Sequence, residues 1–465
     1  MKIRLADRFN VHASFSERIL QDVTTGAKRL LDEDQYEFVL LLDGELDRAG
    51  LLAQYDDESL EVVGEFLATL QDIGAITESD DGKGRSFIKT PVPDIRLNAV
   101  HLEAFGQCNM RCAHCYQGEL YRNVPGLSWE RLERLGHEMH ALQVDNVAIS
   151  GGEPFLNPLT LEIARFYESL RLRVNAFFTN GLALDERIVT ELKALRSRPT
   201  VFLSLDAIRP DGMAFRGFTG AQAESALKGI LRNLELLMEA GIPVVVNTVM
   251  TKENEPTLDL MYDLLSRTPI KSWRIGFPKR AGFFRSDAEE HELSWEEMAQ
   301  TSYGILERHL AGGKPFHLQI EYLYREELLE NLRPLEASEF VCDYEGKRES
   351  CCIKPNGDVV SCAYCVDSVI GNIHRASLAD VWYSGEMHRV KNLRIADIDE
   401  CRDCAIRSLC ATGCRANAAF LGGHFEHSKD EYACKAVTFF VQRIVPLLTR
   451  HGVAMDPSIA GLLAK

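Results

Sequence analysis

Several features that would place this chain in a common class are missing from its sequence. No apolar run approaches the roughly 20 residues that a helix needs to cross a bilayer, so we expect no membrane-spanning segment. The N-terminal stretch MKIRLADRFNVHASF lacks the apolar core of a secretory signal, which favours a cytoplasmic protein. Residues 1–90 contain no cysteine. The chain's 13 cysteines all lie beyond them, and in a reducing compartment they predict metal or redox chemistry rather than disulfides.

Positive charge is also in short supply. The chain has 52 Lys and Arg residues against 69 Asp and Glu residues, which gives a net charge of −17. The first 90 residues hold 19 of the acidic and 10 of the basic residues, a net charge of −9. An acidic surface repels phosphate groups, so we expect no nucleic-acid partner.

Residues 1–90 show helical patterns followed by a short strand-like stretch. SERILQDVTTGAKRLL has a short helical pattern, and ESLEVVGEFLATLQDIGAITES predicts an amphipathic helix that ends at Gly74. Two helices followed by a small wing predict a winged-helix-like unit over 1–90, and a solvated accessory domain is the alternative. The net charge argues against DNA as its partner. The polar stretch DDGKGRSFIKTPVPD that follows is typical of a linker.

From about residue 98 apolar strand-like runs alternate with helical stretches. The runs are AVHLEAF, NVAIS, VNAFFT, TVFLSLD, VVVNTVM and SWRIGF. Six strands alternating with helices predict an α/β fold, a partial (β/α)6 TIM-like barrel over 97–310. We expect a helical connector over 311–339 and a cysteine-rich domain over 340–450, in which CIKPNGDVVSC forms a hairpin that turns at Asn356-Gly357.

The stretch GQCNMRCAHCYQ, directly after the first predicted strand, holds the cysteines Cys108, Cys112 and Cys115. In barrels of this kind, chemistry takes place on the loops that follow the strands. Three thiolates can bind three irons of a 4Fe–4S cluster and leave the fourth iron open to a small bidentate ligand. A zinc site completed by His114 is the alternative.

The second predicted strand is followed by SGGEP, at Ser150–Pro154. CxxxCxxC and SGGEP, in this order on successive strands, resemble the radical S-adenosylmethionine (radical SAM) superfamily. The resemblance implies that the open iron chelates the methionyl amine and carboxylate of SAM. One electron then cleaves the sulfonium and releases a 5′-deoxyadenosyl radical.

The same resemblance implies a set of SAM contacts. The glycines Gly151 and Gly152 expose backbone near the ligand, and Glu153 accepts hydrogen bonds from the methionyl ammonium. The remaining contacts are the backbone at Tyr116 for the adenine, Ser204 and Asp206 for the ribose, Arg216 for the carboxylate, and Asn180 and Asn247 as further candidates. For each polar residue taken alone, a structural role at a strand end is an open alternative.

Ten more cysteines crowd into residues 342–434. Five of them read C-x2-C-x5-C-x3-C-x19-C, and upstream Gly357 opens a G-x4-C motif. This pattern resembles the SPASM auxiliary-cluster domain of peptide-modifying radical SAM enzymes and implies three 4Fe–4S clusters in all. Carried over by position, one auxiliary cluster is bound by Cys401, Cys404, Cys410 and Cys434, and the other by Cys342, Cys362 and Cys414. Zinc remains the alternative for the C-x2-C pattern.

The second of these sets lacks a fourth cysteine where the family often has one, near Lys347. We assign Cys352 to this place, with Cys351, Cys365 or an open iron as alternatives. An open iron would accept a thiolate from the substrate, because thiolates are natural soft ligands.

The N-terminal unit, with LLDGELDRAGLLAQY and VGEFLATLQDIGAI, is similar to the elements that bind the leaders of ribosomally made peptides as an added strand. Together the resemblances imply a peptide maturase that installs a cross-link, with a thioether to a backbone or side-chain carbon favoured, as in a sactipeptide. Its partners would be a precursor with a leader and a cysteine-bearing core, and a low-potential donor such as flavodoxin or ferredoxin.

Other functions stay open at this point. The enzyme would otherwise form a carbon–carbon link or carry out another oxidation of a peptide. Formylglycine formation on a sulfatase is a further reading, but such relatives place an acid directly after the hairpin cysteine, where this chain has Ala363. A zinc-stapled interaction protein with a winged-helix arm is the alternative without catalysis.

Overall fold

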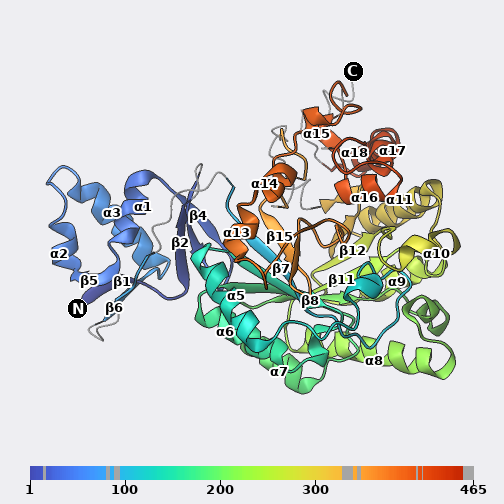
Figure 1. Ribbon diagram of the computed structural model, residues 1–465, viewed down its shortest axis with the longest axis horizontal. Coiled ribbons are helices and arrows are strands. Elements are labelled where there is room, and N and C mark those ends of the chain that lie inside the picture. The colour runs from blue at the N-terminus through green and yellow to red at the C-terminus, as the bar shows by residue number, and fades with distance from the viewer. Residues whose placement is uncertain are drawn as a thin grey trace.

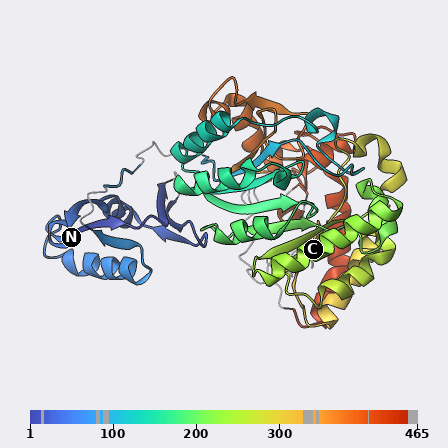
Figure 2. The same ribbon diagram turned by 90° about the horizontal axis from the view of Figure 1, so that it is seen from below.

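The computed structural model describes residues 1–13, 17–79, 84–87, 95–326, 339–342, 347–404, 407–410 and 412–453. An N-terminal unit, blue in Figure 1, stands to one side of a much larger body. The view from below separates the two in the same way (Figure 2). Within the described residues, none of the helices combines the length and apolarity required to cross a membrane.

The described part of the N-terminal unit contains two small antiparallel sheets and three helices. The first sheet has the order β5-β1-β6 and the second the order β2-β3-β4. Its strands are β1 (Lys2–Leu5), β2 (Phe9–Ala13), β3 (Arg18–Asp22), β4 (Lys28–Leu31), β5 (Asp43–Asp47) and β6 (Ile76–Ser79). Its helices are α1 (Glu33–Leu40), α2 (Arg48–Leu52) and α3 (Leu60–Asp72). They enclose a core of their own, separate from that of the large body.

One part of this unit differs from the sequence-based expectation. The predicted helix α3 and the strand after it are confirmed. The helical reading of SERILQDVTTGAKRLL is wrong, because its described part forms β3 and β4. Gly26 turns the chain between them, with φ at +77° and its N–H donating to the carbonyl of Asp22 at 2.7 Å. A backbone in this left-handed conformation cannot continue a right-handed helix.

The large body is built on a sheet of 11 strands in the order β14-β13-β12-β11-β10-β9-β8-β7-β15-β16-β17. All six predicted strands are present, and each pairs in parallel with the next. They are β7 (Ala99–Phe105), β8 (Asn146–Gly151), β9 (Arg173–Thr179), β10 (Thr200–Ser204), β11 (Val244–Val249) and β12 (Ser272–Gly276).

Helices follow these strands as the alternating pattern predicts. They are α4 (Gly118–Tyr121), α5 (Trp129–Ala141), α6 (Leu159–Ser169), α7 (Glu186–Ala194), α8 (Gly220–Glu239), α9 (Leu258–Leu265), α10 (Phe284–His291) and α11 (Trp295–Ala311). Helices α5 to α8 lie on one side of the sheet, and the C-terminal segments lie on the other (Figure 1). On α5, Leu132, Leu135 and Met139 are fully buried in the core that this layer forms with the strands. The fold class is therefore as predicted, a parallel α/β barrel-like sheet.

The helical connector predicted over 311–339 is wrong where the structure describes it. Strand β13 (His317–Ile320) continues the parallel sheet beside β12, and β14 (Tyr324–Arg325) pairs back onto it. Leu318 and Ile320 on β13 are buried. A strand of four residues is too short to show a clear alternating pattern among charged neighbours. Residues 327–338 lie outside the described residues.

The cysteine-rich segment is attached to the same sheet. The predicted hairpin is present, as β15 (Ser350–Ile353) and β16 (Asp358–Val360), and β17 (Val369–Asn372) adds to it. Strand β15 pairs in parallel with β7, which brings the hairpin beside the strand that precedes the cysteine trio. The remaining helices are α13 (Leu378–Trp382), α14 (Gly385–Lys391), α15 (Arg407–Cys410), α16 (Arg415–Phe420), α17 (Glu431–Phe439) and α18 (Val445–Arg450).

A buried carboxylate joins the N-terminal unit to the barrel. Asp145, just before β8, forms a bidentate ion pair with Arg96 at 3.0 and 2.7 Å. From the N-terminal unit, Lys28 Nζ lies 2.6 Å and His12 Nε2 3.1 Å from its oxygens. Burial alone would raise the pKa of Asp145, but His12, Arg96 and Lys28 lower it to about 2. The unit is thus docked through charge as well as packing.

Candidate active site

The cysteine trio occupies the loop after β7, and the SGGEP loop supports it from the neighbouring strand. The N–H groups of Gly152 and Glu153 donate to the carbonyls of Phe105 at 2.8 Å and Gln107 at 2.7 Å. A Cβ on Gly152 would lie only 2.2 Å from the carbonyl oxygen of Gln107, so any side chain there would push the loops apart. The second glycine of the motif is required by this close approach.

Two polar side chains reach the cysteine sulfurs. Arg216 Nη1 donates to Cys112 Sγ at 3.6 Å, and Asn180 Nδ2 donates to Cys108 Sγ at 3.8 Å. The backbone carbonyl of Arg216 also accepts from the N–H of Arg111 at 3.2 Å, so the same residue holds the loop. Donors aimed at sulfur favour the thiolate form, which is the form that binds metal.

The thiols of the cysteine trio are protonated at neutral pH unless a metal ion binds them. Burial raises the pKa of Cys108 to about 11 and also raises the pKa values of Cys112 and Cys115. Protonated thiols at neutral pH can bind iron only by releasing their protons. The three half-buried cysteines therefore form a site that metal completes.

The spacing of the sulfurs separates a cluster from a single ion. Around one zinc at Zn–S distances of about 2.3 Å, ligand sulfurs lie roughly 3.8 Å apart. Among the described residues, the one group of three or more possible ligand side chains with atoms within 4.8 Å of one another is His101, Glu103 and Cys352. None of the cysteine groups is that tight, which fits ligands to the separate irons of a cluster. His114, the alternative zinc ligand, stacks on Phe215 at 4.6 Å and faces Asp206 at 3.8 Å.

Glu153, predicted to bind the methionyl ammonium, is fully buried and strongly hydrogen-bonded within the protein. Its carboxylate accepts from the N–H of Asn180 at 2.7 Å, Thr179 Oγ1 at 2.7 Å and the N–H of Phe155 at 3.2 Å. Burial nevertheless raises its pKa to about 7. Glu153 thus ties the loop after β8 to the end of β9, and one acceptor position remains for a ligand.

The two residues predicted for the ribose differ in their surroundings. Asp206 is buried, accepts from the N–H of Val249 at 2.8 Å and pairs with Arg216 Nη2 at 2.5 Å. Asp206 therefore has the structural role at a strand end that the sequence analysis gave as an alternative to ligand binding. Ser204, at the end of β10, is half-buried, and its hydroxyl makes no hydrogen bond within the described residues. Ser204 is therefore more available than Asp206 to form a hydrogen bond with a ligand hydroxyl.

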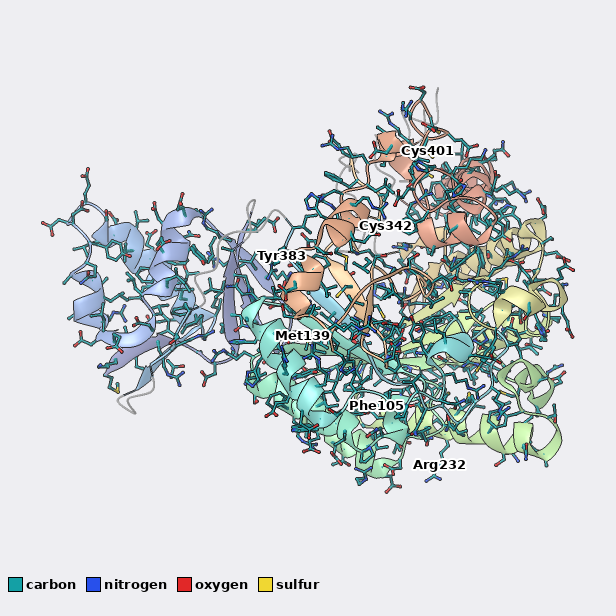
Figure 3. All side chains as sticks on the ribbon, in the orientation of Figure 1. Phe105, Met139, Arg232, Cys342, Tyr383 and Cys401 are labelled. Atoms are coloured by element: carbon teal, nitrogen blue, oxygen red, sulfur yellow. The ribbon has the colours of Figure 1, made fainter. Side chains whose placement is uncertain are left out.

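The C-terminal cysteines predicted for each auxiliary cluster influence one another's pKa values, and Cys342 also packs beside Cys401 of the other set. Cys410 has its pKa raised to about 12 by burial and then by Cys434, Cys401 and Cys404. Cys414 has its pKa raised to about 11 by burial, and the thiols of Cys362 and Cys342 add to this. Figure 3 shows Cys342 and Cys401 in the C-terminal part, on the far side of the sheet from the outer helices.

The sequence did not reveal a buried ion pair that links the loop of the cysteine trio to the hairpin of β15 and β16. Glu103 on β7 receives Lys354 Nζ on both oxygens at 3.0 Å, Tyr116 Oη at 2.9 Å and Gln117 Nε2 at 2.7 Å. Lys354 also donates to the carbonyl of Ala363 at 2.9 Å. Tyr116 and Gln117 belong to the trio's loop, and Lys354 and Ala363 to the hairpin. The sequence did contain one signal for this ion pair, the acidic residue Glu103 inside the apolar run AVHLEAF.

The tight group of His101, Glu103 and Cys352 is not a separate metal site. The Lys354 ammonium already occupies the side of Glu103 that a cation would approach, at 3.0 Å from both oxygens. A second cation there would face this fixed positive charge in a fully buried position.

The fold and the cysteine sites define an enzyme with an α/β barrel and separate cysteine-bound centres. Comparison with known proteins makes this specific. A family model described as the radical SAM superfamily matches residues 102–265, and one described as an iron-sulfur cluster-binding domain, SPASM, matches 342–405. The chain is thus a radical SAM enzyme with a SPASM domain, which uses SAM and iron–sulfur clusters.

Curated relatives match about 70% of the chain at moderate identity. An AdoMet-dependent heme synthase from Methanosarcina barkeri is 27% identical over 345 residues, which cover 71% of this chain and 94% of the relative. The mycofactocin maturase MftC from Mycobacterium tuberculosis is 28% identical over 322 residues, 68% of this chain and 77% of the relative.

Solved structures share the fold. SuiB from Streptococcus suis, bound to its precursor peptide SuiA, superposes with a TM-score of 0.66 at 15% identity, covering 93% of this chain and 99% of SuiB. The enzyme anSMEcpe with bound AdoMet gives a TM-score of 0.59 at 18% identity and covers 79% of this chain and 98% of its own. The wider coverage by SuiB includes most of the N-terminal unit.

Proposed function

We propose that this enzyme matures a ribosomally synthesised peptide by installing a cross-link. A thioether to a backbone or side-chain carbon is the favoured product and a carbon–carbon link the second. The observation that carries the proposal is the N-terminal unit, docked on the barrel through Asp145 and covered by the fold match to SuiB, which was solved with a precursor peptide.

Residues in the loops at the strand ends would hold the cofactors. Cys108, Cys112 and Cys115 would bind the first cluster, with Asn180 and Arg216 donating to two of the sulfurs. SAM would lie against the strand ends, touched by groups from successive loops: the backbone of Tyr116, Gly151 and Gly152, the remaining acceptor of Glu153, the hydroxyl of Ser204 and the side chain of Arg216. When bound, the cluster and SAM supply a 5′-deoxyadenosyl radical that abstracts a hydrogen atom from the substrate.

Strand β4 is the surface that would receive a leader peptide. It is the last strand of the sheet β2-β3-β4 and pairs with β3 along one edge. Three of its four residues are exposed, and Leu30 is 66% exposed. An open edge offers backbone hydrogen bonds to an added strand, and exposed apolar side chains give such a strand its specificity.

The substitution Leu30→Glu tests this surface. The probe is a fluorescently labelled precursor encoded beside the gene, and binding is followed by anisotropy. We expect Leu30→Glu to weaken binding at least tenfold while SAM cleavage by the reduced enzyme is unchanged. The matched control is Leu264→Glu on α9, where the leucine is 36% exposed and far from the unit in sequence. Equal affinity of wild type and Leu30→Glu would contradict the leader assignment.

A tetrapyrrole substrate is the second candidate, because curated heme synthases are among the relatives. Fe-coproporphyrin III, supplied to the reduced enzyme with SAM, separates the two candidates by mass spectrometry. Loss of mass from the porphyrin supports the second candidate, and an altered precursor supports the first. Formylglycine formation is disfavoured, since the position after Cys362 is Ala363, which carries no acid.

A further inference from the structure

The auxiliary cluster assigned to Cys342, Cys362 and Cys414 needs a fourth ligand or has an open iron. Three cysteines without another assignment lie close by in sequence, namely Cys351, Cys352 and Cys365. They occupy different environments. The choice between them decides whether this cluster can bind a substrate.

Cys351 and Cys352 are consecutive on β15, so their side chains point to opposite faces of the sheet. Cys351 is buried in the main core, among the apolar side chains of the barrel and its helices. It faces away from Cys352, Cys362, Cys365 and Cys414, which belong to the neighbouring cluster of side chains around Val360. Position alone removes Cys351 from the choice.

Cys352 points to the face that carries the cysteines, but its sulfur has another partner. Its Sγ donates to Glu103 Oε1 at 3.5 Å, next to the Lys354 ammonium. It pairs with Val360 across the hairpin and with His101 on β7. A thiolate here would lie beside the Glu103 carboxylate in a fully buried place, which is unfavourable. Cys352 is therefore suited to remain a thiol.

Cys365 lies in the same turn as an assigned ligand. Its N–H donates to the carbonyl of Cys362 at 2.9 Å, and this turn brings the two side chains to one side. Cys365, Cys362 and Cys414 pack in one cluster of side chains, which also includes Cys352, so the partner of each sulfur decides between the two cysteines. The buried Lys391 ammonium donates to the carbonyl of Ser361 at 2.9 Å and lies near Cys351, Cys362, Cys342 and Cys365, so it would stabilise thiolate charge here without favouring one of these cysteines.

We propose that Cys365 is the fourth protein ligand of this auxiliary cluster and that Cys352 is a free thiol held by Glu103. The thiol of Cys365 releases its proton to water as its sulfur bonds to iron. This replaces the sequence-based assignment of Cys352. A cluster with four cysteine ligands passes electrons but offers no iron to a substrate thiolate, so a thioether would form without the substrate sulfur bound to this cluster. The inference needs the auxiliary cluster but not the proposed peptide substrate.

Iron analysis and pulsed EPR test the assignment without any substrate. The background is the variant Cys108→Ala/Cys112→Ala/Cys115→Ala, which leaves only the two auxiliary clusters, roughly eight irons per chain. On it we place Cys365→Ala, Cys352→Ala or, as a matched control, Cys351→Ala, and add ¹³C-cyanide as an iron ligand. We expect Cys365→Ala either to lose about four irons or to show a new ¹³C coupling. Cys352→Ala and Cys351→Ala should match the background.

Two results would overturn the proposal. One is iron loss or cyanide coupling in Cys352→Ala, with Cys365→Ala equal to the background. The other is cyanide coupling in the background itself, which would show an open iron. The EPR signal of the second auxiliary cluster, held by cysteines that none of these variants touches, reports whether the domain has folded in each case. Neither readout involves the peptide, so failure here is distinct from failure of the proposed function.

Discussion

Glu103 connects the loop of the cysteine trio to the hairpin that carries Lys354. Burial alone would raise its pKa, but Lys354 and its other partners lower it, so both members of the pair are charged in the interior. Neither side chain is exposed at all. Such pairs are costly to break one member at a time, because the remaining charge is left unpaired.

The first prediction concerns this pair. Lys354→Met should destabilise the enzyme by about 3–5 kcal/mol, since it leaves the Glu103 carboxylate buried without a counter-ion. Thermal unfolding of the apoprotein, followed by circular dichroism, measures the loss. The double variant Glu103→Gln/Lys354→Met removes both charges and should recover most of the melting temperature. A melting temperature for Lys354→Met equal to that of wild type would show that the pair is not charged as described.

Lys391 provides a second prediction at the residue scale. Its ammonium is buried, donates to the carbonyls of Lys347 and Ser361 at 2.9 Å each, and lies near Cys351 and the auxiliary cysteines Cys362, Cys342 and Cys365. A nearby positive charge favours reduction of a cluster, so Lys391→Met should lower the potential of that cluster by tens of millivolts. Redox titration followed by EPR measures it. Lys391→Arg keeps the charge and should shift the potential less; equal shifts in both variants would exclude a charge effect.

At the scale of elements, the sequence predicted those features that extend over several residues. Each of the six strands β7 to β12 is an apolar run bounded by polar residues, and α3 has a full amphipathic stripe. Strand β13 was missed because it has only four residues, and β3 and β4 were misread because Gly26 interrupts a helical pattern. The grouping of the cysteines remains a prediction from spacing. The proposed choice of Cys365 over Cys352 could not be made from the sequence, because it depends on the three-dimensional position of Glu103.

The joint between the N-terminal unit and β8 gives a prediction about pH. Burial lowers the pKa of His12 to about 4, so docked His12 is neutral, whereas released His12 regains an ordinary pKa of about 6.5. As pH falls from about 7.5 to about 5.5, only the released form gains a proton, and docking should weaken by about 1.4 kcal/mol, or tenfold. Small-angle X-ray scattering would show this as an increase in the radius of gyration. The variant His12→Gln should lack the change, and an equal increase in it would contradict the role of His12.

At the scale of the whole molecule, one sheet carries both kinds of centre. The loop after β7 holds the cysteine trio, and β15 pairs with the same strand and leads into the auxiliary cysteines. The N-terminal unit attaches at Asp145, just before β8. Under the proposed function, leader binding and radical chemistry would therefore take place in separate parts of the chain.

Removal of residues 1–90 tests this division. We expect the truncated enzyme to lose turnover of the full precursor, because β4, the strand proposed to bind the leader, is gone, and to retain cleavage of SAM, because the trio's loop is intact. Liquid chromatography with mass spectrometry quantifies both products. Normal processing of the precursor by the truncated enzyme would show that the unit does not bind the leader.

The measurement that tests the account most directly is the yield of 5′-deoxyadenosine from SAM after anaerobic reduction with dithionite, compared between wild type and Cys112→Ala. The account predicts formation by wild type and none by Cys112→Ala, although this variant keeps roughly eight irons in its auxiliary clusters. An equal yield from Cys112→Ala, or no yield from wild type carrying roughly twelve irons, would contradict the claim that the cysteine trio holds the cluster that cleaves SAM.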